Sequence, residues 1–403
     1  MTSSPGRPKV LVLGSGVTLL GVIRALSKVA ADVFVLPDAQ GPARRSRWFR
    51  KAPSYLAGLT PASLPEALRK SPDRMVLMPA SDAWVKAVAS LPQDIMGRHA
   101  ASVPPVAAVE ALVDKGRFRE TLNHLGLPHP TTRSLSSVGD LPTAADLKTS
   151  FLKPVGSQEF FARFGVKAFR VESREEAEAR LTSCIAAGLK MMLQEYIPGP
   201  PTNHYFIDGF VDRNGDVRAR FARRRLRMSP PDFGNSTLME SVPLSETGSA
   251  AATLDSLFAF LHYRGVFSAE FKRDARTDEF NLIEVNARPW WYVEFAERCG
   301  VNVCELAVLD ATGKSLPTIS HYALGRRCVY PYYDLDAVRA EIAAGRLSPA
   351  AATRSWLGSY QPIFRWSDPL PALGEVAEIV RRRLGRWKER NRFLHRKPSR
   401  PAH

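Results

Sequence analysis

The sequence has few cysteines and no long apolar run. Its 403 residues include four cysteines, and none forms a CxxC pair or lies at zinc-site spacing from a histidine. They are therefore interpreted as ordinary thiols in a reducing compartment, which argues against a disulfide framework or a structural zinc site. No stretch approaches the roughly 18 uncharged apolar residues of a membrane span. The first residues, MTSSPGRPK, lead into a strand-like VLVLG without a hydrophobic targeting core, so we expect a cytoplasmic protein.

Acidic residues are also scarce, with 40 Asp and Glu against 56 Lys and Arg and a net charge of +16. Residues 381 to 400 alone hold ten Lys or Arg and one Glu, so most of the excess lies in a tail. This tail is expected to form a basic amphipathic helix. The helix either makes a weak contact with an anionic membrane or RNA, or packs on the body with its arginines in water. Its apolar positions are Val376, Ile379, Val380, Leu384 and Trp387.

The length and a composition of 45% hydrophobic and 24% charged residues predict a globular protein of about two to four modules. KVLVLGSGVTLLGVIRAL has the pattern of a strand, a glycine turn and a helix, and DVFVLP and RMVLMPASD of further parallel strands. A dinucleotide fingerprint would need glycine at Leu19. Gly14, Gly16 and Gly21 either let amides approach a small anion or allow close packing. The expected modules are residues 1–105, 106–195, 196–315 and 316–403.

The middle of the chain alternates helical and strand patterns. We expect a helix from Val106 to Leu125, ended by Gly126 and Pro128. SFLKP and VKAFRV are expected to be strands that flank a loop, and a helix is expected from about Ser173 to Ala187. KMMLQEYIPGPP reads as an apolar strand broken by Pro-Gly.

The segment GVFSAEFKRDARTDEFNLIEVNARPWW contains two alternating runs separated by turn residues, which predicts a hairpin. In the second run Leu282, Glu284, Asn286 and Arg288 are expected on one face, and Ile283, Val285 and Ala287 on the other. In the first run Ser268, Glu270 and Lys272 lie opposite Phe267, Ala269 and Phe271. A turn centred near Thr277 would place Glu270 directly across from Glu284. Two opposed carboxylates repel unless a cation lies between them, which points to a divalent metal.

Taken in order, these segments resemble the ATP-grasp superfamily, and within it the carboxylate-amine ligases that join amino acids or peptides. The resemblance covers roughly residues 8 to 315 and is strongest from Val106 to Trp291. It implies an α/β fold of ATP-grasp type: an N-terminal Rossmann-like parallel-sheet module, then two α+β lobes that clamp ATP, and a C-terminal extension. In place of the glycine-dense loop of many relatives the chain has GSQEFFARFGVK, where Lys167 is expected near the phosphates.

The resemblance also implies roles for individual residues. DKGRFRETLNHLGLPHPTT and FLKPVGSQ are similar to the segments whose lysines reach the nucleotide phosphates, which are Lys115 and Lys153 here. MLQEYIPG resembles the linker that meets the adenine: the backbone of Glu195 and Ile197 would bond its edge, and Gln194 or His204 its amino group or the ribose. Asn203 is a further candidate for the ribose. SAEFK and LIEVNARP resemble the metal-binding strands, so Glu270, Glu284 and Asn286 would bind Mg²⁺, or alternatively Mn²⁺, with oxygen ligands.

Three further side chains are assigned to catalysis or to the substrates. Arg288 would stabilise the transferred phosphoryl group or the acyl phosphate. Arg225 or Arg227 would steer an acidic substrate, unless this arginine cluster is simply a solvated surface. Asp82 would bind the incoming amine, unless Ser81 or Asp82 only caps a helix.

The expected function is therefore an ATP-dependent ligase that activates a carboxylate as an acyl phosphate and joins it to an amine, with ADP and phosphate as products. Two alternatives stay open at this point. One is a phosphotransferase of the same fold without an amine acceptor. The other is a nucleotide-gated protein whose basic tail binds RNA or a membrane.

Overall fold

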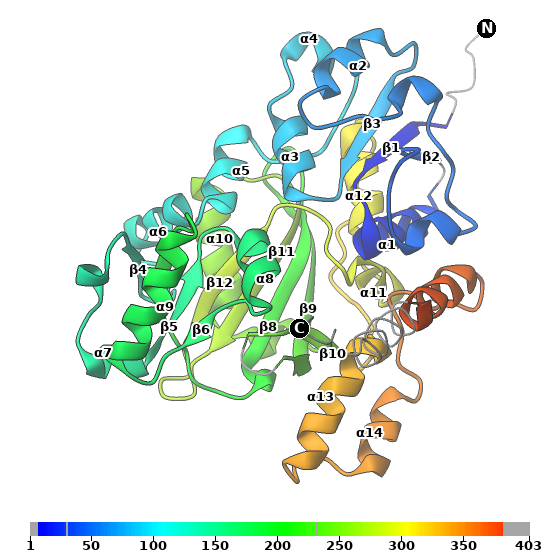
Figure 1. The fold of residues 1–403 in the computed structure, drawn as a ribbon. Helices are drawn as coiled ribbons and strands as arrows, with labels where there is room; N and C mark the ends of the chain where they lie inside the picture. Colours follow the sequence, from blue (N-terminus) through cyan, green and yellow to red (C-terminus); the bar gives the residue numbers. More distant parts are fainter. Residues whose placement is uncertain (1–6, 30, 231–232, 382–403) are drawn as a thin grey trace, which may run out of the picture.

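The N-terminal part is a small parallel α/β module, as predicted. A computed structural model describes residues 7–29, 31–230 and 233–381, and Figure 1 shows the arrangement of its elements. Three parallel strands pair in the order β2-β1-β3. A Cβ at Gly14 would lie 2.9 Å from the Cβ of Ala80, and one at Gly21 would lie 2.9 Å from Cγ1 of Val293, so these two glycines serve close packing. The elements are β1 (Lys9–Leu13), α1 (Gly16–Leu26), β2 (Asp32–Val35), η1 (Pro42–Arg45), η2 (Ser54–Leu56), α2 (Leu64–Lys70), β3 (Met75–Pro79), α3 (Asp82–Ala89) and α4 (Gln93–Met96).

The helix expected from Val106 to Leu125 is two helices, α5 (Val106–Val113) and α6 (Lys115–His124). The break falls at Asp114, whose backbone is extended and whose carboxylate accepts from the N–H groups of Gly116 and Arg117. An aspartate at this position satisfies the first amides of a new helix, which is why the run does not continue. The cap places Lys115 at the first position of α6.

A four-stranded antiparallel sheet follows, in the order β4-β7-β5-β6. Its core includes Leu152, Phe160 and Leu181, and the helix expected near Ser173 to Ala187 is confirmed as α9. The expected loop between the two strands contains a helix, α8, because Phe160 and Phe164 pack on the sheet beside Phe169. The elements are β4 (Thr132–Leu135), η3 (Val138–Asp140), α7 (Ala144–Lys148), β5 (Ser150–Pro154), α8 (Ser157–Phe164), β6 (Phe169–Arg170), α9 (Arg174–Ala186) and β7 (Met191–Glu195).

The largest sheet has six strands in the order β12-β11-β8-β9-β10-β13, each paired antiparallel with its neighbours. One face packs Ile207 and Phe267 into a core with α10, and the other face packs Phe210 and Phe221 against the N-terminal module. The elements are η4 (Pro201–Asn203), β8 (His204–Val211), β9 (Val217–Ser229), β10 (Asn235–Ser241), η5 (Leu244–Thr247), α10 (Ala250–Phe260), β11 (Gly265–Arg273), β12 (Phe280–Asn286), α11 (Val293–Arg298) and α12 (Val303–Ala311).

The C-terminal segment adds β13 (Arg327–Val329) to the edge of this large sheet, followed by α13 (Pro331–Ala343) and α14 (Pro349–Trp356). Residues 370 to 381 form a further helix, and the rest of the predicted basic helix, residues 382 to 403, lies outside the described residues. None of the helices described is long and apolar enough to cross a membrane.

Candidate functional site

A cavity of about 410 Å³ lies between the four-stranded sheet and the six-stranded sheet. It receives side chains from β5 and β7 on one side and from β8, β9, β11 and β12 on the other, with α6 at its edge. Nearly all of the residues expected at the site from the sequence line it. They are Asp82, Lys115, Lys153, Lys167, Gln194, Glu195, Ile197, His204, Arg225, Glu270, Glu284 and Asn286.

The predicted hairpin is confirmed, and Glu270 of β11 pairs directly with Glu284 of β12. The register shifts immediately beyond this pair, because Phe271 pairs with Leu282 and leaves Ile283 without a partner position. This bulge reverses the expected faces of two residues. Leu282 is 1% exposed and packs in the core with Val285, whereas Ile283 is half-buried and outside that core; all three residues also border the cavity. The extra residue lets Leu282 join the core and keeps Glu284 facing the cavity.

The oxygen atoms of Glu270, Glu284 and Asn286 fit a hard divalent cation. Oε1 of Glu270 accepts from Arg225 at 2.9 Å and from His204 at 2.8 Å. Both bonds go to the same oxygen, so Oε2 is left to bind a metal. Within the described ranges no side chain bonds the carboxylate of Glu284 or the amide of Asn286. The proposed metal ligands are two carboxylates and one amide oxygen. They are thus not a cluster of three His, Cys, Asp or Glu, and the described residues contain no cluster of that kind. A donor set of two carboxylates and one amide suits Mg²⁺, which completes its shell with phosphate and water.

The two carboxylates have opposite shifts in pKa. Enclosure by protein and the charge of Glu270 raise the pKa of Glu284 above its usual value. Burial also opposes the charge of Glu270, but the Arg225 guanidinium and the bond from His204 outweigh it and lower the pKa of Glu270. Burial beside Arg225 lowers the pKa of His204 to about 4, so this ring is neutral near pH 7 and donates through Nδ1. A cation between the carboxylates would relieve the repulsion felt by Glu284.

Three lysines converge on the same cavity from separate elements. Nζ of Lys115 donates to the carbonyl of Pro154 at 3.1 Å, and Nζ of Lys153 donates to Oε1 of Gln194 at 3.3 Å. Lys167 follows α8 and donates to Asn235 of β10 at 2.6 Å, so it bridges the two sheets across the cavity. Burial lowers the pKa of all three, and that of Lys115 falls to about 8 with Lys153 as the second cause. Crowded ammonium groups of this kind bind a polyanion.

The end of β7 and the segment that connects it to the six-stranded sheet form one wall of the cavity. The carboxylate of Glu195 accepts from Arg276 at 3.0 Å and from the amide of Thr131 at 3.2 Å, which fits a role for its backbone rather than its side chain. Gln194 donates to Thr132 at 3.1 Å while it accepts from Lys153. Asn203 does not line the cavity and donates to the carbonyl of Arg273 at 2.9 Å.

Three arginines of β9 form a buried row in which each guanidinium pairs with a carboxylate. Arg223 pairs with Asp208, Arg225 with Glu270 and Arg227 with Asp334. Arg225 lines the cavity, and its Nε also donates to Ser236 at 2.8 Å. The structure does not bring Arg227 to the cavity, because β9 runs past it to α13, where Asp334 binds this guanidinium. The alternative of a solvated arginine surface does not hold for this row either, since all three arginines are buried.

Arg288 is held by Asp82 through two contacts, from Nε at 2.6 Å and from the second terminal nitrogen at 3.1 Å. Asp82 lines the cavity at the first position of α3, whereas Arg288 is not among the residues that line it. Ser81, not Asp82, caps this helix by accepting from the amide of Trp84. The pair therefore joins the N-terminal module to the end of β12 at the rim of the cavity.

Lys272 and Tyr196 are among the cavity residues that have no assigned role in the sequence analysis. Lys272 lies on the same strand face as Glu270, and its Nζ lies 4.6 Å from the centre of the Tyr196 ring. Both residues line the cavity. The period-two alternation of β11 already placed Lys272 beside Glu270, so this signal was present in the sequence.

No model of a known protein family matches the chain. A D-aspartate ligase of Enterococcus faecium (strain Aus0004) is 22% identical over 320 residues, which are 74% of this chain and 76% of the relative. Among solved structures, an N5-carboxyaminoimidazole synthetase of Staphylococcus aureus has a TM-score of 0.58 at 16% identity, over 84% of this chain and 86% of its own. An L-amino acid ligase of Bacillus licheniformis has a TM-score of 0.54 at 16% identity, over 76% and 75%. These structures share the fold of the chain.

Proposed function

We propose that this chain, which has the ATP-grasp fold predicted from its sequence, is an ADP-forming carboxylate-amine ligase. The observation that carries the proposal is the cavity between the two sheets, where the opposed Glu270 and Glu284 face lysines from separate elements. The D-aspartate ligase and the L-amino acid ligase are enzymes of this class by name. The alternatives, a phosphotransferase and a nucleotide-gated binding protein, gain no support from the relatives.

The chemistry requires a carboxylate to become an electrophile. A substrate carboxylate oxygen attacks the γ-phosphorus of ATP, the bond to the β,γ-bridging oxygen breaks, and an acyl phosphate and ADP result. The amine nitrogen then attacks the acyl carbon, phosphate leaves, and the nitrogen loses a proton to give the amide. Lys115 and Lys153 offset the charge of the phosphates, with Lys167 beside them. We assign the adenine edge to the backbone of Glu195 and Ile197, with Gln194 alongside.

We assign a magnesium ion to Glu270, Glu284 and Asn286, with Mn²⁺ as an alternative. When bound, the metal would neutralise phosphate oxygens and polarise the γ-phosphoryl group. Arg225 and His204 act on the site by holding Oε1 of Glu270 in place. Arg225 is therefore a positioning residue in this proposal, and no substrate role is assigned to Arg227.

The pair of Asp82 and Arg288 is proposed to receive the substrates. In this structure each group satisfies the other, so a ligand that brings a cationic amine to Asp82 releases Arg288 to contact the phosphoryl group or the acyl phosphate. This assignment explains why a carboxylate at the rim of the cavity is held by an arginine just beyond the end of β12, the strand that carries Glu284 and Asn286.

Replacement of Asp82 by asparagine is expected to raise the KM for the amine about tenfold or more, because a charged hydrogen bond is lost. The KM for ATP should change little. Steady-state kinetics with each substrate varied in turn measures both values. Asp94→Asn is the matched control, because Asp94 is exposed and pairs with Arg69 in the same module. An unchanged KM for the amine with a lowered kcat would show that Asp82 acts only through Arg288.

ATP use is expected to weaken as the pH rises through about 8. The pKa of Lys115 is lowered to about 8, so the free enzyme carries this positive charge below that pH and loses it above. The value of kcat/KM for ATP should therefore fall from pH 7 to pH 9. Lys115→Arg should remove that fall, because arginine stays protonated. A profile that is the same in the wild type and the variant would remove Lys115 from ATP binding.

The experiment that tests the function is phosphate release from ATP and Mg²⁺ with pooled acids and amines, followed by mass spectrometry of active pools. The first pool should contain both enantiomers of aspartate, because a D-aspartate ligase is a relative. Release that needs both an acid and an amine, with an amide mass, establishes the ligase. Release that needs an acid alone and yields a phosphorylated product supports the phosphotransferase.

A cytoplasmic location and a weak contact of residues 381 to 400 with anionic surfaces belong to the same proposal. Their support is the composition of the sequence, with ten Lys or Arg and one Glu in this segment. The module boundaries near residues 105, 195 and 315 also stay predictions, although β13 shows that the last segment shares a sheet with the one before it.

A further inference from the structure

The helix formed by residues 370 to 381 turns its apolar face outward. Surface helices normally bury that face. Here the side chains spaced three or four residues apart are among the most exposed apolar groups described, with exposed fractions of 57% for Leu370, 62% for Leu373, 59% for Val376 and 48% for Val380. We call these four residues, together with Trp366, the apolar stripe.

The opposite face of this helix is the one that packs on the protein. Gly374 approaches the side chain of Arg45 so closely that a Cβ would overlap it, and Glu375 accepts from the hydroxyl of Tyr330 at 3.4 Å. The inward face is thus small and polar, and the outward face is apolar. This orientation indicates that the stripe meets something other than water.

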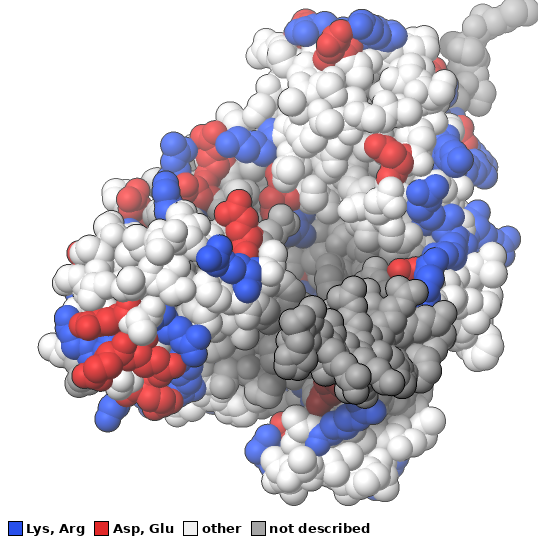
Figure 2. Space-filling model, viewed as in Figure 1, with Lys and Arg blue, Asp and Glu red and all other residues white. Residues whose placement is uncertain are grey.

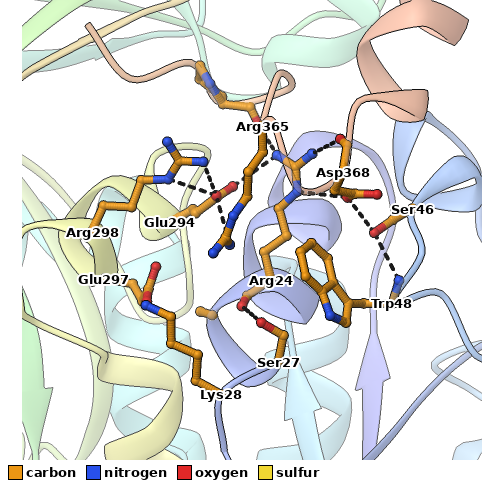
Figure 3. Close-up of polar contacts among 12 residues, drawn as sticks. Arg24, Ser27, Lys28, Ser46, Trp48, Glu294, Glu297, Arg298, Arg365 and Asp368 are labelled. Carbon is orange, nitrogen blue, oxygen red and sulfur yellow. Dashed lines mark hydrogen bonds and ion pairs between the residues drawn. The ribbon is translucent and has the colours of Figure 1, made fainter. Parts of the chain in front are cut away.

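The segment just before the helix is anchored by polar contacts, and Figure 3 shows those around Asp368 and Arg365. Asp368 accepts from Arg24 at 3.1 Å, from Ser46 at 2.7 Å and from the amide of Arg47 at 2.9 Å. The adjacent Arg365 stacks on Trp48 with its guanidinium 5.1 Å from the ring centre. Trp366 lies within this fixed segment and is 89% exposed. Exposure of so large an aromatic ring from an anchored segment is typical of an interaction surface.

Cationic side chains lie next to the helix that carries the stripe. The segment from Ala39 to Pro65 contains no acidic residue. The same segment packs against the inward face of the helix through Arg45, which meets Gly374. It also holds the turn before the helix, where Ser46 donates to Asp368 and Arg47 donates to the carbonyl of Ser367, next to Trp366. Figure 2 shows blue side chains gathered along this edge of the molecule. The segment from Ala39 to Pro65 has five exposed cationic residues, which we call the basic segment: Arg44, Arg45, Arg47, Arg50 and Lys51.

We propose that the apolar stripe and the basic segment together bind the surface of an anionic phospholipid membrane. A row of apolar groups with cations along its edge matches a bilayer interface, where acyl chains lie beneath anionic head groups. RNA would satisfy the cations but not cover aliphatic side chains. A second copy packed stripe against stripe would bring two basic segments together, which like charges oppose. The ten Lys or Arg of residues 381 to 400 follow the stripe directly and add to the attraction.

This surface is separate from the cavity residues and does not depend on the ligase proposal. It would hold the protein at a membrane without crossing it, in keeping with the absence of a spanning helix among the residues described.

The test is co-sedimentation of the full chain with vesicles of phosphatidylcholine alone or mixed with phosphatidylglycerol. We expect binding to the anionic vesicles only, weakened by salt. Leu373→Glu with Val376→Glu should lower the affinity at least about tenfold. Arg44→Gln with Arg45→Gln should lower it about 25-fold, since each cation contributes a factor of about five. Matched controls at exposed positions around the four-stranded sheet should bind like the wild type. They are Ile185→Glu in α9, and Lys148→Gln in α7 combined with Lys190→Gln just before β7.

Four results would overturn the proposal. The wild type could fail to bind anionic vesicles, or could bind neutral vesicles equally well, which removes the role of the basic segment. Alternatively, sedimentation equilibrium could show a dimer that Leu373→Glu with Val376→Glu dissociates, without any vesicle binding, which would assign the stripe to a second copy. Binding of single-stranded RNA without vesicle binding would assign the basic segment to nucleic acid.

Discussion

Replacement of Glu284 by glutamine is expected to lower the rate of ADP formation at least about 100-fold. Loss of a residue that binds the metal directly should reduce activity more than loss of a residue that only supports such a ligand. Glu284 is the better of the two carboxylates to test. Glu270 also holds Arg225 and His204, so its loss would leave a buried guanidinium unpaired. Glu284 has no bonded partner among the described side chains, and glutamine fills the same volume. The loss of activity should therefore occur without a loss of stability.

A second measurement separates metal binding from catalysis. Titration of ATP into the protein at fixed Mg²⁺, followed by calorimetry, should show weaker binding for Glu284→Gln, and more Mg²⁺ should recover part of it. Glu279→Gln is the matched control, because Glu279 lies in the same hairpin but is exposed at the turn, away from the cavity. ADP formation by Glu284→Gln at the wild-type rate would overturn the assignment of this residue to the metal.

The hairpin shows how far local sequence patterns reach. Alternation in both strands and the turn between them predicted that Glu270 faces Glu284, and the observed register agrees. The same alternation failed at Leu282, because a bulge inserts Ile283 and changes the face of every residue before it. Periodicity carries no sign of a single inserted residue, so the core position of Leu282 could be found only from the packing.

Pairings between distant segments were beyond the sequence. The period-two spacing of Arg223, Arg225 and Arg227 indicated a common face, but solvent and buried carboxylates are equally compatible with that spacing. Their partners lie up to 107 residues away. Asp82 and Arg288 are 206 positions apart, and each seemed available for substrate until their contact was seen. The charge of a residue is local information, whereas the identity of its partner depends on the whole fold.

Replacement of Arg24 is expected to have the largest effect on stability. Arg24 is fully buried in α1, and all five of its N–H donors are used. Nε donates to Asp368, one terminal nitrogen donates to Glu294 and to the carbonyl of Pro362, and the other donates to the carbonyls of Ile363 and Asp368. These bonds join the N-terminal module, α11 and the C-terminal segment in one network, shown in Figure 3.

Arg24→Met keeps an unbranched side chain that fills the inner part of the same space but removes every donor, and the carboxylates of Glu294 and Asp368 lose a buried cation. We expect the free energy of unfolding in urea to fall by about 3–5 kcal/mol. Residues 362 to 381 should also become sensitive to proteases, because three of the five bonds hold this segment through backbone carbonyls. Arg44→Met is the matched control: Arg44 is exposed in the same module, and its replacement should change stability by less than about 0.5 kcal/mol. If both variants unfold at the wild-type midpoint, the network does not hold the three parts together, and the anchored segment that carries Trp366 needs another support.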